Sequence, residues 1–428
     1  MNSWIPSTKP LPTIMRGGGV QYYTTEKSHS MVPLSVLIPC ASFPKSFKWA
    51  GNKLDITNRI GNCVPPLLMK AIAENIKKAP FMKDTEQPTV ISTFAGCGGS
   101  SLGYKMAGFK ELLAVEWDDN AVETFKLNFP EVPVYHGDIA KLTGAECMRL
   151  AGGIKPGELD VLDGSPPCQG FSMAGKRKYD DPRNSLFKEY ARLLAELQPK
   201  AFVMENVTGM IEGHMKQAYL KIMATLRGCG YTAKGEVLNA MYYGVPQSRQ
   251  RVIIVGVRND LGIEPSHPKP KTKPITVREA FNNVPPGLRY ELSGKKQIEY
   301  VAKMKPGDSF ADALGKTYGY DTERLAYDKP APTIKKSLGS SRLGFIHPEH
   351  PRRITIAELK RLGSFPDEYR LTGKFEEQWA RIGNSVPPLL MKAIATHIRK
   401  AILMPISRAR IASGTSETAV PCLAKAGV

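Results

Sequence analysis

The alternation of short apolar runs with longer amphipathic stretches between residues 88 and 257 constrains the fold of this chain most strongly. The apolar runs have the length and composition of strands buried on both faces of a sheet. Amphipathic stretches at 185–198 and 214–230 suit helices, and Gly228 and Gly230 suit the end of the second one. We therefore predict an α/β fold in which helices cover both faces of a parallel sheet. The five predicted strands are TVISTF (89–94), LLAVEW (112–117), LDVLDG (159–164), AFVMENV (201–207) and RVIIVGV (251–257).

A long internal repeat is the second constraint. Residues 42–79 and 364–401 align without a gap at an offset of 322, and 21 of the 38 positions are identical. The ten residues from Val64 to Ala73 are unchanged in the second copy. Two copies this far apart do not form a solenoid. We therefore interpret about the first 80 residues as a degraded copy of the segment that precedes the C-terminal tail.

The rest of the chain has less regular patterning. Pro, Gly and Lys are frequent after the last predicted strand, which indicates a smaller, irregular domain. A helical pattern returns near residue 353, and the polar end of the chain is typical of a disordered tail. The predicted organisation is a duplicate segment (1–80), a catalytic domain (88–257), an irregular domain (258–352), a segment that packs back on the catalytic domain (353–401) and a tail (402–428).

Charge and cysteine content indicate the class of partner and the compartment. The chain has 59 Lys and Arg against 40 Asp and Glu, a formal net charge of +19. Such an excess favours a polyanion such as nucleic acid, although a generally basic surface is the alternative. The seven Cys are scattered without a metal-type CxxC pair, which argues against a zinc site or a disulfide framework. No secretory signal or membrane helix is recognisable, so we expect a reducing cytosol.

A glycine-rich turn follows the first predicted strand. Phe94-Ala-Gly-Cys-Gly-Gly-Ser100 precedes a predicted helix, and glycines at this place let the backbone approach a ligand. A tight strand–helix turn without a ligand would give the same pattern. About 20 residues later, Glu116 ends the next strand, where an acid can bind a ribose diol or remain a solvated strand end. Together, the turn and Glu116 favour a nucleoside cofactor.

The third predicted strand leads into Asp163-Gly-Ser-Pro-Pro-Cys168-Gln-Gly-Phe-Ser172. Structural cysteines usually lie within apolar segments, whereas Cys168 follows two prolines and stands among polar residues. The prolines would present its thiol rigidly on a loop. We therefore favour a nucleophile over an inert Cys at this position.

An acid also ends the very apolar strand 201–207. Glu205 is costly there without a partner, so it can serve as an acid or as a hydrogen-bond partner for a base ring. The alternative is a structural pair with a nearby Arg. Arg249 and Arg251 are the candidates, because their spacing puts them on one side of a strand.

These elements occur in an order that closely resembles the DNA (cytosine-5) methyltransferases. The matching segments between residues 88 and 401 are STFAGCGGSSLG, VEWD, HGDI, DGSPPCQGFS, MENV, PQSRQRVIIVGV and RIGNSVPP. The Pro-Cys-Gln and Glu-Asn-Val elements in this order are specific to that family. The resemblance implies a Rossmann-like domain that binds S-adenosylmethionine and a target-recognition domain at 258–352.

The resemblance also implies roles for individual residues. The implied catalytic residues are Cys168 as the nucleophile, Glu205 at cytosine N3, and Arg249 and Arg251 in support. The implied cofactor-binding residues are Phe94, Gly96, Gly98, Glu116, Trp117, Asp138, Asn384 and Ser385. The implied DNA-binding residues are Gln169, Ser172, Thr333 and Ile334.

The function implied is methylation of cytosine C5 within a short sequence of double-stranded DNA, through a covalent adduct of Cys168 with a flipped-out base. The expected state is a monomer, with a restriction endonuclease as a separately acting partner. One alternative is a tRNA cytosine methyltransferase of the same fold, and another is a non-catalytic DNA-binding relative. A nicotinamide oxidoreductase would share the Gly turn but would not account for Cys168 or Glu205.

The repeat departs from the family pattern, in which RIGNSVPP occurs once. In the N-terminal copy Cys63 replaces Ser385, and the residues that precede it have lost their acidic, helix-like character. We interpret this copy as a remnant of tandem duplication. Both copies could compete for one groove on the catalytic domain, and the intact lead-in favours the C-terminal copy. The alternative is that the N-terminal copy comes from a mispredicted start.

Overall fold

The computed structural model describes residues 21–22, 30–31, 33–44, 47–62, 65–67, 87–167, 186–288, 290–292, 295–315, 322–339 and 343–407. The chain divides into two compact units, residues 1–85 and 86–428. None of the helices in this described part combines the length and the hydropathy that a membrane crossing needs.

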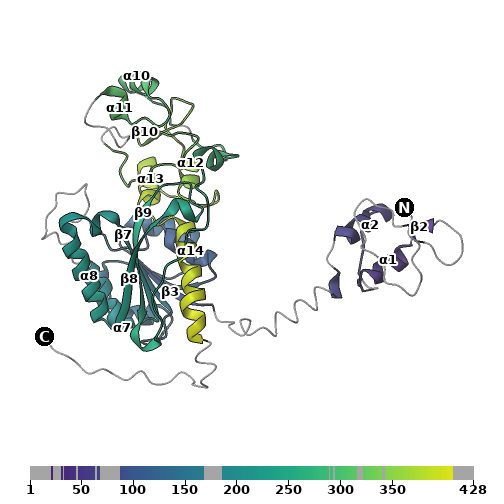
Figure 1. Cartoon of the computed structure of the whole chain (residues 1–428), viewed down its shortest axis with the longest axis horizontal. Coiled ribbons are helices and arrows are strands. Elements are labelled where there is room, and N and C mark those ends of the chain that lie inside the picture. Colours follow the sequence, from purple (N-terminus) through teal and green to yellow (C-terminus); the bar gives the residue numbers. More distant parts are fainter. Residues whose placement is uncertain are drawn as a thin grey trace. The chain divides into compact units, whose positions relative to one another are not determined.

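The larger unit is built on a seven-stranded sheet of order β5-β4-β3-β6-β7-β9-β8 (Figure 1). The strands β3 to β7 are parallel, whereas β9 is antiparallel to both of its neighbours. The predicted α/β fold and the five predicted strands are confirmed, but the expectation that 251–257 is parallel is wrong. The strands are β3 (Thr89–Thr93), β4 (Lys110–Glu116), β5 (Val134–His136), β6 (Val161–Gly164), β7 (Ala201–Val207), β8 (Tyr231–Asn239) and β9 (Gln250–Arg258).

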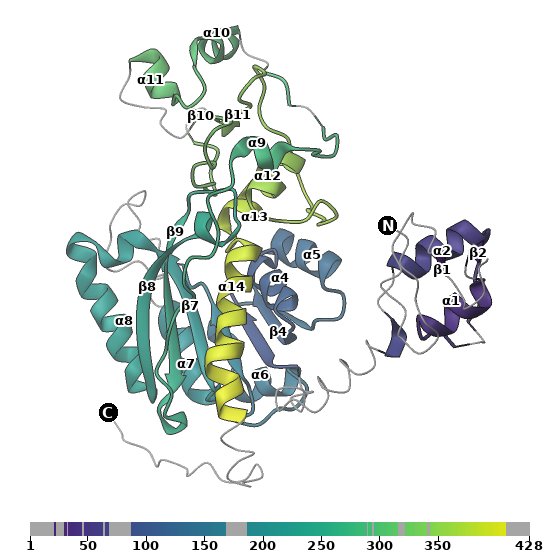
Figure 2. The ribbon, with the colours of Figure 1, turned by 45° about the vertical axis from the view of Figure 1, so that its right-hand side comes forward.

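Helices cover both faces of the sheet because alternate strand residues point to opposite sides. On one face, Leu162, Phe202 and Ile254 pack with the helices α6 to α8. On the other, Val161, Val203 and Ile253 pack with α4 and α14, and α5 adjoins Ala114. Figure 2 shows α14 lying along this second face beside α4. The helices are α4 (Gly99–Met106), α5 (Asp119–Asn128), α6 (Gly144–Leu150), α7 (Leu186–Leu197), α8 (Lys216–Gly228) and α14 (Pro388–Ile398).

The region between β9 and α14 has the irregular character that the sequence indicates. Its elements are short, and α12 lies beside α13 and α9. Thr276, Ser309 and Thr355 each cap a helix through a capping box, which compensates for the shortness of these helices. The elements are α9 (Val277–Phe281), α10 (Lys295–Lys303), α11 (Phe310–Leu314), β10 (Glu323–Arg324), β11 (Phe345–Ile346), α12 (Ile356–Leu362) and α13 (Phe375–Asn384).

The predicted boundaries of the irregular domain stay predictions, but the start of the tail needs a correction. A π-helix continues α14 over Arg399–Leu403, and residues 404–407 are helical. Ile402 and Ile406 are buried against the sheet face that α14 covers, so apolar packing extends the helix past the predicted tail boundary at 402. Residues 408–428 lie outside the described part.

The smaller unit has a core of its own. Leu37, Ala41, Ile56 and Ile60 form its buried cluster, and Trp49 packs against them. Its elements are β1 (Gln21–Tyr22), β2 (Ser30–Met31), α1 (Leu34–Cys40) and α2 (Lys53–Asn62).

Candidate active site

The glycine-rich turn between β3 and α4 lies at the carboxyl end of the first strand of the larger unit. Phe94, Gly96 and Gly98 all have positive φ, at 54°, 57° and 88°. A Cβ on Gly98 would lie 2.5 Å from the ring of Phe129, so only glycine fits there. The turn is therefore shaped by backbone conformations that few other residues adopt, as a site for close ligand approach requires.

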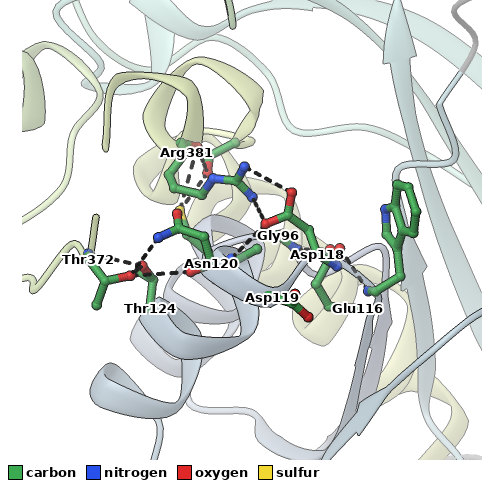
Figure 3. A network of polar contacts seen from close by, with 12 residues as sticks. Gly96, Glu116, Asp118, Asp119, Asn120, Thr124, Thr372 and Arg381 are labelled. Carbon is green, nitrogen blue, oxygen red and sulfur yellow. Dashed lines mark hydrogen bonds and ion pairs between the residues drawn. The ribbon is translucent and has the colours of Figure 1, made fainter. Parts of the chain in front are cut away.

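The carboxylate of Glu116 organises this turn. Its Oε2 accepts a hydrogen bond from Gly96 N at 2.7 Å, and its Oε1 accepts from the backbone nitrogens of Trp117 and Asp118 (Figure 3). A carboxylate oxygen has two acceptor positions, so Oε2 can still bind a ribose hydroxyl. The Trp117 indole is 75% exposed, which leaves a flat apolar surface beside the turn. These residues fit the nucleoside part of S-adenosylmethionine.

Asp138 follows the next strand, and its side chain caps a short 3-10 helix by accepting a hydrogen bond from Ala140 N. Gly137 N donates to the backbone oxygen of Glu116, so the ends of β4 and β5 are tied together. Glu116, Trp117 and Asp138 therefore lie at one edge of the sheet, where open α/β sheets place ligand-binding residues.

A residue that the sequence analysis did not single out closes this side of the site. Arg381, in α13, donates two hydrogen bonds to Asp118, at 2.9 and 3.1 Å (Figure 3). Asn384 and Ser385 follow at the end of the same helix. Asn384 is exposed, whereas the Ser385 hydroxyl is buried, donates to the Arg381 carbonyl and lies 3.1 Å from Cys97 Sγ. The cofactor role predicted for Asn384 and Ser385 stays a prediction.

The predicted catalytic residues that the structure describes lie on or next to two neighbouring strands, β7 and β9. Glu205, at the end of β7, pairs with Arg251 of β9, with 2.8 Å between Oε1 and Nε. Both side chains are largely buried, at 11% and 13% exposure. Asn206 Nδ2 donates to the carbonyl of Pro166, which ties β7 to the loop after β6. Cys168, Gln169 and Ser172 follow on that loop but lie outside the described residues.

Arg249 makes a different set of contacts. Its Nη1 donates to the Ile334 carbonyl at 2.8 Å and its Nη2 to the Gly383 carbonyl at 3.0 Å. Burial, and then the neighbouring Arg251, lower the pKa of Arg249 to about 9. Arg249 thus joins the catalytic sheet to the irregular region and to α13, while Arg251 alone pairs with Glu205 among the described contacts.

The predicted DNA-binding pair of the irregular region lies close to Arg249. Thr333 Oγ1 donates to the Ser248 carbonyl, and Ile334 N donates to Gln247 Oε1. Thr333 is half-buried, whereas the Ile334 side chain has no exposed surface. The predicted DNA contacts of Thr333 and Ile334 stay predictions. Of the two side chains, only that of Thr333 has exposed surface with which to contact DNA.

A buried acid lies behind the catalytic edge. Asp163 points to the same sheet face as Glu205, and burial, followed by the charge of Glu111, raises its pKa to about 8. Tyr104 Oη donates to Asp163 Oδ1 at 3.4 Å. Burial likewise raises the pKa of Glu111 to about 7. Sequence patterning gave no sign of this pair, because the two acids lie on different strands, β4 and β6.

This arrangement can be compared with known proteins. The sequence profile of the C-5 cytosine-specific DNA methylases matches residues 22–78 and 88–400. The type II methyltransferase M1.HphI of Haemophilus parahaemolyticus is 36% identical over 331 residues, which cover 73% of this chain and 87% of that protein. The type II methyltransferase M.XorII of Xanthomonas oryzae pv. oryzae is 34% identical over 365 residues, covering 74% and 85%.

A solved structure adds the fold. It is that of a prophage-encoded protein of E. coli, described as a DNA modification methyltransferase, with a TM-score of 0.64 and 27% identity. The match covers 74% of this chain and all of that one. Because the family profile spans most of the chain and the relatives agree with it, this protein belongs to the C-5 cytosine-specific DNA methylases and is a DNA (cytosine-5) methyltransferase.

Proposed function

We propose that this enzyme methylates C5 of cytosine within one short sequence of double-stranded DNA and thereby protects DNA in a restriction–modification system. The observation that carries the chemical part is the Glu205–Arg251 pair beside Asn206, which holds the loop leading to Cys168. These contacts support the proposal because Glu205, Arg251 and Pro166 lie close together, and Cys168 follows Pro166 by two residues in the sequence. The net charge of +19 supports a polyanionic substrate.

In the proposed mechanism the Cys168 thiolate adds to C6 of the cytosine. This addition removes the aromaticity of the ring and makes C5 nucleophilic. The Glu205 carboxyl group donates a proton to N3 and thereby stabilises the adduct, and Arg251 orients this group through its 2.8 Å contact with Oε1. When bound beside Gly96, Glu116 and Trp117, S-adenosylmethionine supplies the electrophilic methyl group. Loss of the C5 proton then expels the Cys168 thiolate.

C6 is inaccessible inside a base-paired stack, so the cytosine must leave the duplex before Cys168 can reach it. The basic, irregular region 258–352 is the proposed reader of the sequence, through side chains in the major groove. Thr333, which is tied to Ser248 next to Arg249, lies where this region meets the catalytic sheet.

The test compares wild type with Cys168→Ser in a host that lacks cytosine methylation, with 5-methylcytosine in plasmid DNA mapped at base resolution. We expect methylation at one short motif in the wild type and none in Cys168→Ser. The matched control is Cys40→Ser, since Cys40 is an exposed thiol of the smaller unit. Methylation by Cys168→Ser would exclude the proposed nucleophile, and scattered methylation would exclude sequence-specific protection.

The adduct is tested on DNA that carries 5-fluorocytosine at the mapped site. Fluorine replaces the C5 proton whose loss releases Cys168, so the adduct should persist as a complex stable in denaturing gels. A 2-aminopurine base at the target should brighten on binding if the base leaves the stack. No stable complex with the fluorinated DNA would contradict the covalent step, and unchanged fluorescence would contradict base flipping.

A further inference from the structure

The N-terminal unit repeats the local structure of the C-terminal segment as well as its sequence. At the offset of 322, α1 (Leu34–Cys40) corresponds to α12 (Ile356–Leu362) and α2 (Lys53–Asn62) to α13 (Phe375–Asn384). Ser42 and Ser364, two of the few non-glycine residues with positive φ, have φ values of 63° and 60°. Each accepts the same hydrogen bond, from Leu67 N at 3.0 Å and from Leu389 N at 3.2 Å. Over the described residues 33–44, 47–62 and 65–67 the two segments therefore fold alike, and the expectation that the residues before the N-terminal copy have lost helical character is wrong for Leu34–Cys40.

The C-terminal segment uses this fold to cover a defined surface, which we call the α4 face. The α4 face comprises Gly98, Gly103 and Asp118 with their neighbours on α4 and α5. Tyr369 packs on Phe129 and Gly98, and Met391 lies against Gly103. Arg381 forms the bidentate pair with Asp118.

The repeat retains the residue types that face this surface. Arg59 stands at the position of Arg381, and Phe47 at that of Tyr369. The unchanged stretch from Val64 to Ala73 corresponds to Val386–Ala395, which includes Met391.

The residues that face the irregular region are lost instead. Trp379 donates to the Lys335 carbonyl, Phe375 packs on Tyr290, and Glu358 pairs with Arg352. In the repeat these three positions hold Thr57, Lys53 and Val36. The N-terminal unit thus keeps part of the interface with the α4 face and has lost the three named contacts to the irregular region. At the α4 face it lacks the hydrogen bonds that Thr372 makes with Asn120 and Thr124, because Ala50 stands at the position of Thr372.

The interface that it keeps is uncovered in the N-terminal unit. Phe47 is 48% exposed, whereas Tyr369 is 5% exposed. Leu67 is 64% exposed, whereas Leu389 is half-buried. Phe47 contacts Phe43 and Trp49 within its own unit, and the rest of its ring and the Leu67 side chain are exposed apolar surface.

We propose that the N-terminal unit docks on the α4 face of a second copy of this chain, in place of that copy's C-terminal segment. Each molecule has one α4 face and two segments that fit it. The C-terminal segment is anchored on its own chain by the contacts that Trp379, Phe375 and Glu358 make with the irregular region. The N-terminal unit lacks these three residues. In this proposal docking exchanges segments between copies, so its occupancy rises with protein concentration.

The exchange can be trapped because the repeat carries Cys63 where the C-terminal segment carries Ser385. The Ser385 hydroxyl lies 3.1 Å from Cys97 Sγ, so docking of the repeat would bring the thiols of Cys63 and Cys97 together. Diamide takes two electrons and two protons from such a pair, and one S–S bond forms. Cys97 is buried beneath Ser385 otherwise, and burial raises its pKa to about 11, so it resists random oxidation.

In the experiment, equal amounts of 15N-labelled and unlabelled full-length protein are mixed, equilibrated and treated with diamide. Mass spectrometry then identifies peptides cross-linked between Cys63 and Cys97. We expect hybrid cross-links, with one labelled and one unlabelled peptide, in statistical proportion. Absence of the Cys63–Cys97 peptide would overturn the proposal. Cross-links that are never hybrid would overturn the assignment to a second copy, because they would place the docking within one chain.

A matched pair of variants tests the competition. Arg381→Glu removes the ion pair of the C-terminal segment with Asp118, so it should raise the yield of hybrid cross-links about tenfold. Arg59→Glu should lower this yield by a similar factor. Equal effects of the two variants would contradict the proposal. Cys40, which is exposed on the same unit, reports random collisions, and more Cys40–Cys97 than Cys63–Cys97 product would also contradict it. If Arg381→Glu fails to fold, Arg59→Glu alone still tests the docking. The N-terminal unit has its own core, so this substitution leaves the fold of the larger unit unchanged.

Discussion

The contact between α4 and α14 gives a quantitative prediction for Gly103→Ala. A Cβ at Gly103 would lie 2.5 Å from Met391 Cβ, 2.7 Å from the Pro388 carbonyl oxygen and 2.8 Å from Lys392 N. Carbon atoms pack best at about 3.5–4.0 Å, so the two helices must separate by about 1 Å at this point. Two of the three contacts are to backbone, which cannot rotate away.

The magnitude follows from two opposing contributions. Overpacking of this kind costs about 1–3 kcal/mol, and rigid backbone neighbours place it near the upper value. Replacing Gly by Ala within a helix contributes about 1 kcal/mol in the opposite direction. We therefore expect Gly103→Ala to lower the free energy of unfolding by about 2 kcal/mol.

The assay is urea denaturation followed by far-ultraviolet circular dichroism, with Gly228→Ala as the matched control. Gly228 ends α8, and a Cβ there would meet nothing within 4 Å. Its substitution should leave stability unchanged or raise it by up to about 1 kcal/mol. If Gly103→Ala were as stable as Gly228→Ala, the helices would not be in the close contact on which the reasoning depends.

Three further predictions concern single side chains. Arg249→Lys should lower the free energy of unfolding by about 2–4 kcal/mol, because one ammonium cannot reach both the Ile334 and Gly383 carbonyls, and faster amide exchange at residues 331–339 should accompany the loss. The pKa of Asp163 is raised to about 8 in the folded protein, whereas the unfolded chain releases this proton above about pH 4. The contribution of Asp163 to the free energy of unfolding therefore decreases as the pH rises from about 4 to about 8. Asp163→Asn should therefore gain stability relative to wild type by up to about 1 kcal/mol per pH unit from pH 5 to pH 8 in paired denaturation curves, and a constant difference would refute the assignment. Trp117→Ala should leave the unfolding curve unchanged, since the indole is 75% exposed, yet weaken S-adenosylmethionine binding in calorimetry, and unchanged affinity would remove Trp117 from the proposed pocket.

The sequence predicted the parts of the fold that rest on local apolar patterning. All five apolar runs became strands, because each is long enough to cross a covered sheet and apolar enough to be buried on both faces. Two strands of the seven-stranded sheet were missed. Val134–His136 is short and only partly buried, and Tyr231–Asn239 alternates between buried and exposed residues at the sheet edge. The insertion of β9 between β7 and β8, which makes it antiparallel, depends on chain topology that no local pattern encodes.

For the candidate site, the motifs predicted which residues converge but not how they pair. The spacing of Arg249 and Arg251 puts both on one side of a strand, and either could have been the partner of Glu205. Arg249 instead donates to two carbonyls that are distant in the sequence, those of Ile334 and Gly383. Arg251 therefore pairs with the Glu205 carboxylate. The Asp118–Arg381 pair was missed for the same reason, since its members are 263 residues apart in the sequence.

The C-terminal segment connects the two halves of the candidate site physically. Arg381 fixes Asp118 next to Glu116 beside the glycine-rich turn, and two residues later the Gly383 carbonyl accepts a hydrogen bond from Arg249. A Cβ at Gly383 would lie 2.3 Å from the Lys335 carbonyl oxygen, so the irregular region closes tightly over the same point. Any displacement of α13 must therefore disturb the glycine-rich turn, the Arg249 contacts and the irregular region together. An N-terminal unit docked at this place would supply Arg59 for the contact with Asp118. It would lack the contact that Trp379 makes with the irregular region.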